Sequence, residues 1–160
     1  MHLSENFTLK QLTTEPIAAR KSLDNTPSSD TIECLKLLCV NILEPLQASI
    51  GKPLHILSGY RSRMVNIAAN GSKASDHRFG QAVDFIVADI SSLDLWKNII
   101  QGVYGEIPYD QVIYELNSWV HISYKSVSSQ RSMALSSIID KHGEIEYIRH
   151  HKDTIHTISA

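Results

Sequence analysis

The 160-residue sequence predicts an α+β fold, with N-terminal helices packed on a mainly antiparallel sheet. The first observation is a stripe of apolar residues at helical spacing within residues 32–46. The second is the alternation in "DQVIYEL" and "WVHISYK", two runs separated by a few polar residues, as in a hairpin. The third is the order of the elements, because a helical start followed mostly by strands is not a regular βαβ alternation.

The N-terminal third of the sequence predicts helices. "SENFTLKQLTTE" has the composition of a short docking segment or a helix start, and the turn formers of "DNTPSSD" end this arm. Ser29 or Asp30 can cap the next helix, and Glu33 lies three residues after Asp30, as in a capping box. Pro45 falls inside the apolar stripe, so we expect a kink or a new turn there.

The remaining elements follow from short local patterns. The central part predicts a turn and a short strand ending at Ser58–Gly59, then a short helix before Gly71. Residues 80–88 are rich in strand formers, and residues 91–105 have helical apolar spacing. Beyond the first hairpin, two runs flanking Lys141–Gly143 predict a second one. We expect one domain over residues 1–160, with a docking arm at 1–28 and a less ordered tail at 150–160.

Composition narrows the classes of partner. Hydrophobic residues make up 42% and charged residues 20%, which is ordinary for a soluble globular protein. A formal charge of −2 provides no basic footprint, so we expect no nucleic-acid partner. The start lacks a secretory signal, and no apolar run is long enough to span a bilayer. We therefore expect a protein made in the cytoplasm without membrane insertion, and we expect it to be a monomer. The two cysteines, Cys34 and Cys39, lie five residues apart in a helical segment, which predicts buried thiols.

The stretch "SDHRFGQAVDF" contains two candidate metal ligands, His77 and Asp84. They are seven residues apart, which does not fit neighbours on one helical face. Gly80 allows a turn between them, so that His77 lies in a loop and Asp84 in a strand. A carboxylate between apolar strand residues is costly unless it is paired or binds a metal. The alternative is an Asp at a strand edge, hydrogen-bonded to the preceding turn.

"SWVHISY" supplies a third candidate, His121. A single His in a strand is more often structural, but with His77 and Asp84 it completes a set of two histidines and one carboxylate. Catalytic zinc uses three protein ligands and leaves a fourth position for water. Non-haem iron also uses such a set, usually within a double-stranded barrel that this helix-led chain does not resemble.

A hydrolytic metal site also needs a general base, and Glu115 is the main candidate. If residues 116–118 form a three-residue loop, Glu115 faces Trp119, and both share a face with His121. A two-residue loop turns Glu115 to the opposite face, and Asn and Ser suit either loop. A solvated Glu at a hairpin end is the structural alternative, and Asp110 is the reserve candidate.

Polar residues near the candidate ligands could contact substrate. Arg61 in "SGYRS" can bind a carboxylate or a developing oxyanion. Ser75 lies two residues before His77 and could hydrogen-bond substrate or the ligand shell. Both residues could equally serve turns.

The motifs "SGYRS", "SDHRFGQAVDF" and "WVHIS" together resemble the zinc D-Ala-D-Ala carboxypeptidases and dipeptidases, which include many phage endolysins. The resemblance covers approximately residues 3–125, and the start of the chain is similar to that of the small single-domain, phage-type branch. It implies one catalytic Zn²⁺ on the sheet face, held by His77, Asp84 and His121. It also implies hydrolysis of peptidoglycan peptides containing D-amino acids, with Arg61 contacting the substrate or the oxyanion.

The sequence departs from the family pattern at one position. Many members have the catalytic Glu or Asp three residues before the last His, where this chain has Ser118, so Glu115 would act from six residues away. We expect Ser75, Trp119 and Tyr60 to contact substrate. The resulting hypothesis is an endolysin-like zinc metallopeptidase, a carboxypeptidase or endopeptidase that acts on the cell wall after release or delivery. The alternative is a non-catalytic, zinc-stabilised phage structural or cell-wall-binding module.

Overall fold

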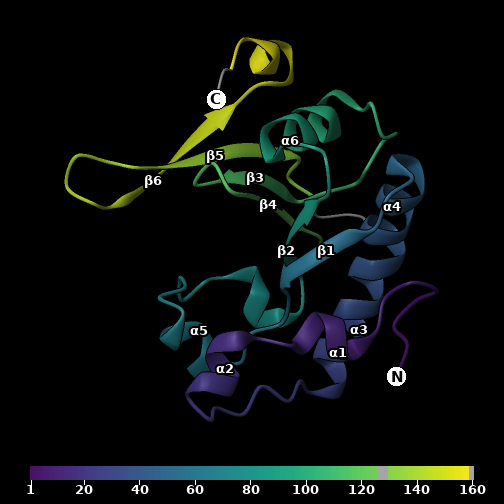
Figure 1. Cartoon of the computed structure of the whole chain (residues 1–160), viewed down its shortest axis with the longest axis vertical. Coiled ribbons are helices and arrows are strands. Elements are labelled where there is room, and N and C mark those ends of the chain that lie inside the picture. Colours follow the sequence, from purple (N-terminus) through teal and green to yellow (C-terminus); the bar gives the residue numbers. More distant parts are fainter. Residues whose placement is uncertain (126–129, 159–160) are drawn as a thin grey trace.

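A computed structural model describes residues 1–125 and 130–158 and shows the expected α+β architecture (Figure 1). The helical elements are α1 (Leu9–Thr13), α2 (Pro16–Arg20), α3 (Ser29–Leu38), the π-helical η1 (Cys39–Leu43), α4 (Glu44–Ile50), α5 (Arg63–Ala68), the 3-10 helix η2 (Asp76–Phe79), α6 (Ser92–Gln101) and the 3-10 helix η3 (Lys152–Thr157). The strands are β1 (Leu54–Ser58), β2 (Ala82–Val87), β3 (Gln111–Glu115), β4 (Trp119–Ser123), β5 (Met133–Ile139) and β6 (Ile145–His150).

The six strands form one sheet in the order β1-β2-β4-β3-β5-β6. Every neighbouring pair is antiparallel except β3 and β5, which run parallel. The hairpin of β5 and β6 therefore extends the sheet beyond β3, and it projects from the body of the molecule (Figure 1). This order brings the two predicted hairpins side by side, because β3 lies between β4 and β5.

The loop between β3 and β4 has three residues, so the first of the two alternatives for Glu115 is confirmed. Leu116 and Asn117 have positive φ angles of 47° and 56°, which turn the chain so that Glu115 pairs with Trp119. Ile113 then pairs with His121. Because side chains alternate along a strand, Glu115, Trp119 and His121 lie on one face of the sheet.

The long N-terminal helix is interrupted at the expected place. The backbone N–H of Glu44 bonds to the carbonyl of Cys39, five residues earlier, and Pro45 then stands in the first turn of α4. Proline has no N–H, and the first turn of a helix is where that loss is tolerated. The start of α3 differs from the prediction, since Ser28 is the cap and its Oγ accepts from the Thr31 N–H. Glu33 makes no capping box, because its carboxylate pairs with Lys36.

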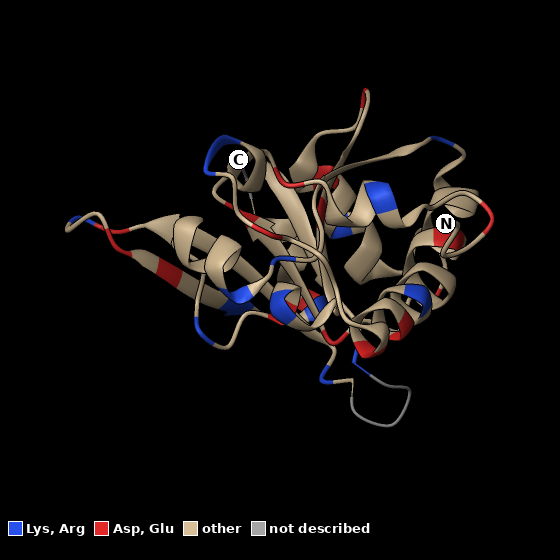
Figure 2. Ribbon diagram, turned by 90° about the horizontal axis from the view of Figure 1, so that it is seen from below, with Lys and Arg blue, Asp and Glu red and all other residues tan. Residues whose placement is uncertain are grey.

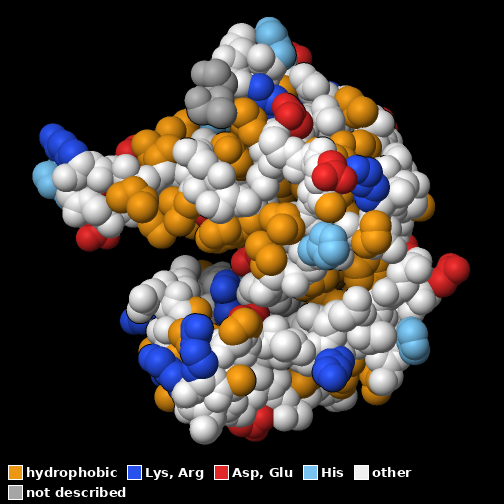
Figure 3. All heavy atoms as spheres, in the orientation of Figure 1, with side chains coloured by type: hydrophobic (Ala, Val, Ile, Leu, Met, Phe, Trp, Pro, Cys, Tyr) orange, Lys and Arg blue, Asp and Glu red, His pale blue; other side chains and the backbone are white. Residues whose placement is uncertain are grey.

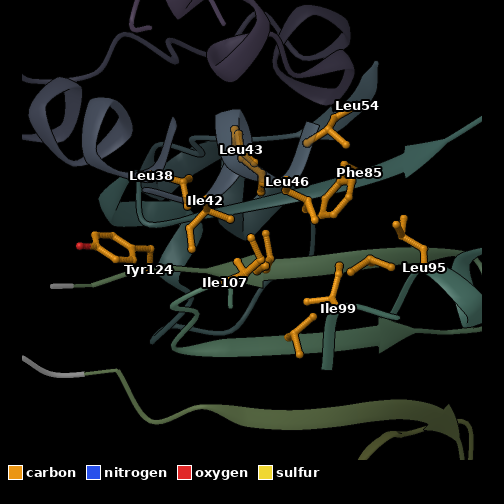
Figure 4. Packing of buried hydrophobic residues seen from close by; sticks show 14 of the residues in the cluster. Leu38, Ile42, Leu43, Leu46, Leu54, Phe85, Leu95, Ile99, Ile107 and Tyr124 are labelled. Carbon is orange, nitrogen blue, oxygen red and sulfur yellow. The ribbon is translucent and has the colours of Figure 1, made fainter. Parts of the chain in front are cut away.

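The core lies between the helices and the face of the sheet that carries Val83, Phe85 and Ile122. Figure 4 shows the side chains of α3, η1 and α4 pointing toward these strands, and Leu95 and Ile99 of α6 packing beside them. Trp96 of α6 stacks on Tyr114 and donates its indole N–H to the Val112 carbonyl at 3.3 Å. With this face covered by helices, the opposite face of the sheet is left to build a cleft.

Both chain ends contribute to this core. In the predicted docking arm, the side chains of Phe7 and Leu12 are buried. In the predicted tail, residues 152–157 form η3, and Ile155 is fully buried near α6. The sequence of η3 has no apolar stripe, so no local pattern could predict this burial. The packing partners of Ile155 come from distant elements. Residues 159 and 160 of the predicted tail lie outside the described residues.

Charged side chains of both signs are interspersed over the ribbon (Figure 2). None of the helices in the described part of the chain has the length and hydropathy that crossing a bilayer requires.

Candidate active site

Three elements bring the predicted ligands together on the open face of the sheet. His77 lies in η2, which ends at Gly80 in a left-handed conformation with a φ of 67°. Asp84 lies in β2 and is paired directly with His121 of β4. A Cβ at Gly80 would also lie 2.8 Å from the Thr31 carbonyl oxygen, so both the turn and the space at this position require glycine. All three ligand residues are buried.

The ligand atoms form a compact triangle. His77 Nε2 lies 3.1 Å from His121 Nδ1 and 3.2 Å from Asp84 Oδ1, and the last two atoms are 2.9 Å apart. Tetrahedral zinc with ligands at about 2.0–2.2 Å places neighbouring ligand atoms about 3.3–3.5 Å apart. The triangle is slightly tighter than one face of such a tetrahedron, and two imidazoles with one carboxylate form a donor set that binds divalent metals. His77, Asp84 and His121 can therefore hold a metal ion.

A second layer of contacts orients His77. Its Nδ1 lies 2.7 Å from the Gly59 carbonyl oxygen, which can only accept, so Nδ1 carries the proton and Nε2 is free for a metal. The Gly59 N–H in turn donates to Glu15 Oε1 at 3.2 Å, and the Ser58 hydroxyl donates to the same oxygen at 2.5 Å. A Cβ on Gly59 would lie 2.2 Å from the Leu12 carbonyl oxygen, so the turn comes this close only with glycine.

The electrostatics of the ligand set favour a charged carboxylate. Burial alone would raise the pKa of Asp84, but the two imidazoles beside it outweigh burial and hold that pKa well below its ordinary value. Burial likewise opposes protonation of His121, whereas the hydrogen bond and charge of Asp84 raise the pKa of its imidazole. Behind them, burial raises the pKa of Glu15 despite the hydrogen bond from Ser58. A divalent cation bound here would neutralise the charge of the Asp84 carboxylate in place of the protons on the two imidazoles.

The ligand set and Glu115 line the same cleft, whose volume is about 460 Å³. One wall comes from η2 and the loop that joins α5 to it and is mainly polar, with Asn70, Ser72 and Asp76. The other comes from the two hairpins and is mainly apolar, with Trp119, Leu135, Ile145 and Tyr147. Figure 3 shows this hollow below the projecting hairpin, with hydrophobic side chains above it and charged ones below. Such a cleft suits an extended chain that is apolar on one side and polar on the other.

Two cleft residues carry hydrogen-bond donors that the described part of the chain leaves without a partner. They are the buried Nε of Arg61 and the buried Nε1 of Trp119. A buried donor without a partner costs free energy, so a donor of this kind in a cleft is suited to a ligand's carbonyl or carboxylate. Arg61 is anchored beside the ligands, because its backbone N–H donates to the His77 carbonyl at 3.1 Å.

The other candidate residues have different positions. Ser75 lines the cleft. Tyr60 does not line it; the ring packs in the hydrophobic core, and its backbone bonds to Leu12. The reserve base Asp110 is also absent from the cleft lining, because its carboxylate accepts several hydrogen bonds from Arg131. His150 is half-buried against Trp96 and hydrogen-bonded to Ser136.

Sequence reasoning missed Glu15 and the two hydroxyl groups that contact Glu115. The Ser137 hydroxyl donates to Glu115 Oε2 at 2.5 Å, and the Tyr147 hydroxyl lies 3.4 Å from Oε1. Both residues come from the β5–β6 hairpin. No local pattern indicates them, because the parallel pairing of β3 with β5 creates these contacts.

Comparison with known proteins agrees with the geometry. A family model described as Peptidase M15 matches residues 5–123, which is 119 of the 160 residues. The match includes all three ligand residues, Arg61 and Glu115, and ends at the last residue of β4. No curated protein matches the chain. Because the family model covers well over half of the sequence, the chain belongs to the peptidase M15 family of metal-dependent peptidases.

Proposed function

We propose that this chain is a zinc peptidase that hydrolyses peptidoglycan peptides containing D-amino acids. The observation that carries the proposal is the convergence of three ligand atoms, within 3.2 Å of one another, in the cleft that Glu115 and Arg61 also line. Membership of a metal-dependent peptidase family supports the reaction class. The peptidoglycan substrate and an endolysin-like role, acting on the wall after release, rest on the resemblance of the three sequence motifs.

The residues present have distinct roles in this reaction. His77, Asp84 and His121 would hold the zinc ion, which would supply the Lewis acidity needed to polarise the scissile carbonyl and to lower the pKa of the attacking water. Glu115 takes the proton from the attacking water and returns it to the leaving amine. Arg61 donates to the negative charge of a substrate carboxylate or of the tetrahedral intermediate.

The register of the sheet supports Glu115 as the base. His121 pairs with Ile113, so Glu115 is two residues further along β3 on the same face. Diagonal neighbours of this kind have Cα atoms roughly 7–8 Å apart, a gap that a long carboxylate side chain and one water can bridge. The Ser118 hydroxyl, where many family members have their acid, instead donates to the Leu116 carbonyl within the loop.

The test combines metal analysis with hydrolysis of purified muropeptides. We expect stoichiometric zinc and cleavage in the wild type, loss of both in His121→Ala, and loss of cleavage with retained zinc in Glu115→Gln. Glu106→Gln, an exposed carboxylate outside the cleft, is the matched control. Zinc binding and thermal stabilisation without any cleavage would support the wall-binding module instead, and wild-type protein without stoichiometric metal would overturn both readings.

A further inference from the structure

We propose that the C-terminal β5–β6 hairpin completes the active site: Ser137 orients the Glu115 carboxylate, and Tyr147 holds its other oxygen and forms the adjoining wall of the cleft. The hairpin begins at Met133, beyond the residues that the family model matches. The inference rests on the proposed role of Glu115 as the general base.

The sheet topology explains why the hairpin reaches Glu115. In the parallel pairing of β3 with β5, Tyr114 is the partner of Ser136, so Glu115 and Ser137 are the next neighbours along both strands. Ser137 is paired in turn with Tyr147 across β5 and β6. The two hydroxyl groups therefore belong to one cross-strand pair on the face that carries the ligands.

Two hydrogen bonds fix the orientation of the Ser137 hydroxyl so that it donates to Glu115. Ser137 is 1% exposed, and its Oγ accepts from the Leu116 N–H at 3.0 Å while its proton points to Glu115 Oε2 at 2.5 Å. The backbone donor fixes the direction of the hydroxyl proton, because the remaining partner within reach is an acceptor. A hydrogen bond to a carboxylate is stronger than a neutral one, so this contact restricts the rotamers of the Glu115 side chain. A general base needs such restriction, because its effect depends on a fixed position relative to the attacking water.

Tyr147 acts at the open side of the same carboxylate. Its hydroxyl lies 3.4 Å from Glu115 Oε1, a longer contact than that of Ser137, and its side chain is half exposed in the cleft. Burial and the nearby charge of Glu115 raise the pKa of Tyr147 to about 12, so the hydroxyl remains a donor at neutral pH. Its ring continues the apolar wall formed by Ile145 and Leu135, where substrate must pass.

The experiment measures kcat and KM for muropeptide hydrolysis by zinc-loaded, full-length variants. Ser137→Ala is expected to lower kcat about 10–100-fold with little change in KM or zinc content. The matched control is Ser136→Ala on the same strand, whose hydroxyl contacts His150 on the opposite face. Ser137→Thr keeps the hydroxyl and should recover most of the lost kcat, which separates the hydrogen bond from a general packing defect.

A double-mutant cycle tests whether Ser137 acts through Glu115. In the Glu115→Gln background, Ser137→Ala should change the residual kcat less than about twofold, because residues that act as one unit are not additive. Equal losses in both backgrounds, or wild-type kcat in Ser137→Ala, would overturn the inference while leaving the base in place. Full activity in the single Glu115→Gln variant would instead overturn the proposed base, and the inference with it.

Tyr147 is tested with two changes of different kind. Tyr147→Phe removes the hydroxyl and should lower kcat severalfold, whereas Tyr147→Ala also removes the wall and should raise KM. Tyr104→Phe is the control, since it loses a hydroxyl contact with Asn98 away from the cleft. Unchanged kcat in Tyr147→Phe together with unchanged KM in Tyr147→Ala would remove Tyr147 from the site.

Discussion

His121 Nδ1 and Asp84 Oδ1 lie 2.9 Å apart although 37 positions separate the two residues in the sequence. The antiparallel pairing of β2 and β4 places them directly opposite each other. Because this pair forms two corners of the ligand triangle, the metal site depends on the sheet register, and metal binding should stabilise the sheet.

Removing the metal should therefore destabilise the protein. A ligand present at 1,000 times its Kd stabilises the folded state by about 4 kcal/mol. We expect a chelator to lower the unfolding temperature of the wild type and to leave that of His121→Ala unchanged, as measured by calorimetry. His150→Ala is the control, because this half-buried His contacts Ser136 outside the ligand set and should keep the response to chelator. An identical melting curve with and without chelator in the wild type would contradict the prediction.

Gly59→Ala should weaken metal binding without touching a ligand. The new Cβ would lie 2.2 Å from the Leu12 carbonyl oxygen, so the turn must move and with it the carbonyl that holds His77. We expect metal affinity to fall about tenfold or more, measured by competition with a chromophoric chelator. Gly51→Ala serves as the control, since Gly51 has open space around it and, unlike Gly59, a positive φ of 70° that alanine would strain. It should lose stability and keep its metal affinity.

Trp119 and Trp96 should respond differently to the same substitution. Trp119→Phe removes an indole N–H that has no partner in the described part of the chain and lines the cleft. If substrate accepts from it, KM should rise about fivefold with little change in melting temperature. Trp96→Phe breaks a buried bond to Val112 and should lower the melting temperature with KM unchanged. Steady-state kinetics and thermal melts of both variants check this, and unchanged KM in Trp119→Phe would exclude Trp119 as a donor to substrate.

Asp110 should contribute a pH-dependent part of the stability. Burial alone would raise its pKa, but the hydrogen bonds from Arg131 outweigh burial and hold the pKa below its ordinary value. A lowered carboxyl pKa stabilises the folded state above the unfolded pKa of about 3.9, and this stability is lost as the pH falls through the folded pKa. At neutral pH, Asp110→Asn should cost about 2 kcal/mol in denaturant unfolding.

The difference between the wild type and Asp110→Asn should shrink as the pH falls from about 4 through the lower folded-state pKa of Asp110, because the carboxyl takes up its proton in the unfolded chain before it does so in the folded protein. Asp153→Asn, on the exposed surface of η3, is the control and should behave as the wild type does. A difference that stays constant over this range would show that the charge of Asp110 is not what stabilises the fold.

Ile155→Ala tests the order of the C-terminal segment. Because Ile155 is fully buried, the change should lower the free energy of unfolding by about 3 kcal/mol. Ile139→Ala removes the same atoms from a side chain that is 63% exposed, and it should cost less than about 0.5 kcal/mol. Equal and small effects of the two changes would contradict the packing of η3 on the core.

The sequence by itself determined the elements and the ligand set. Periodicity and turn residues act over a few positions, so they identified the strands around Asp84 and His121, the break at Pro45 and the turn at Gly80. The set of two histidines and a carboxylate, together with the family resemblance of the three motifs, predicted a metal site. The length of the loop after Glu115 could not be decided locally, since Asn and Ser suit turns of either length.

Tertiary structure decided which side chains support the ligands and the base. The parallel pairing of β3 with β5 brings Ser137 and Tyr147 to Glu115, and the close approach of Gly59 to the first helix places Glu15 behind His77. The same long-range order buries Tyr60 in the core. These contacts join positions far apart in sequence, and which strands become neighbours is set by burial of the whole sheet face rather than by any local pattern.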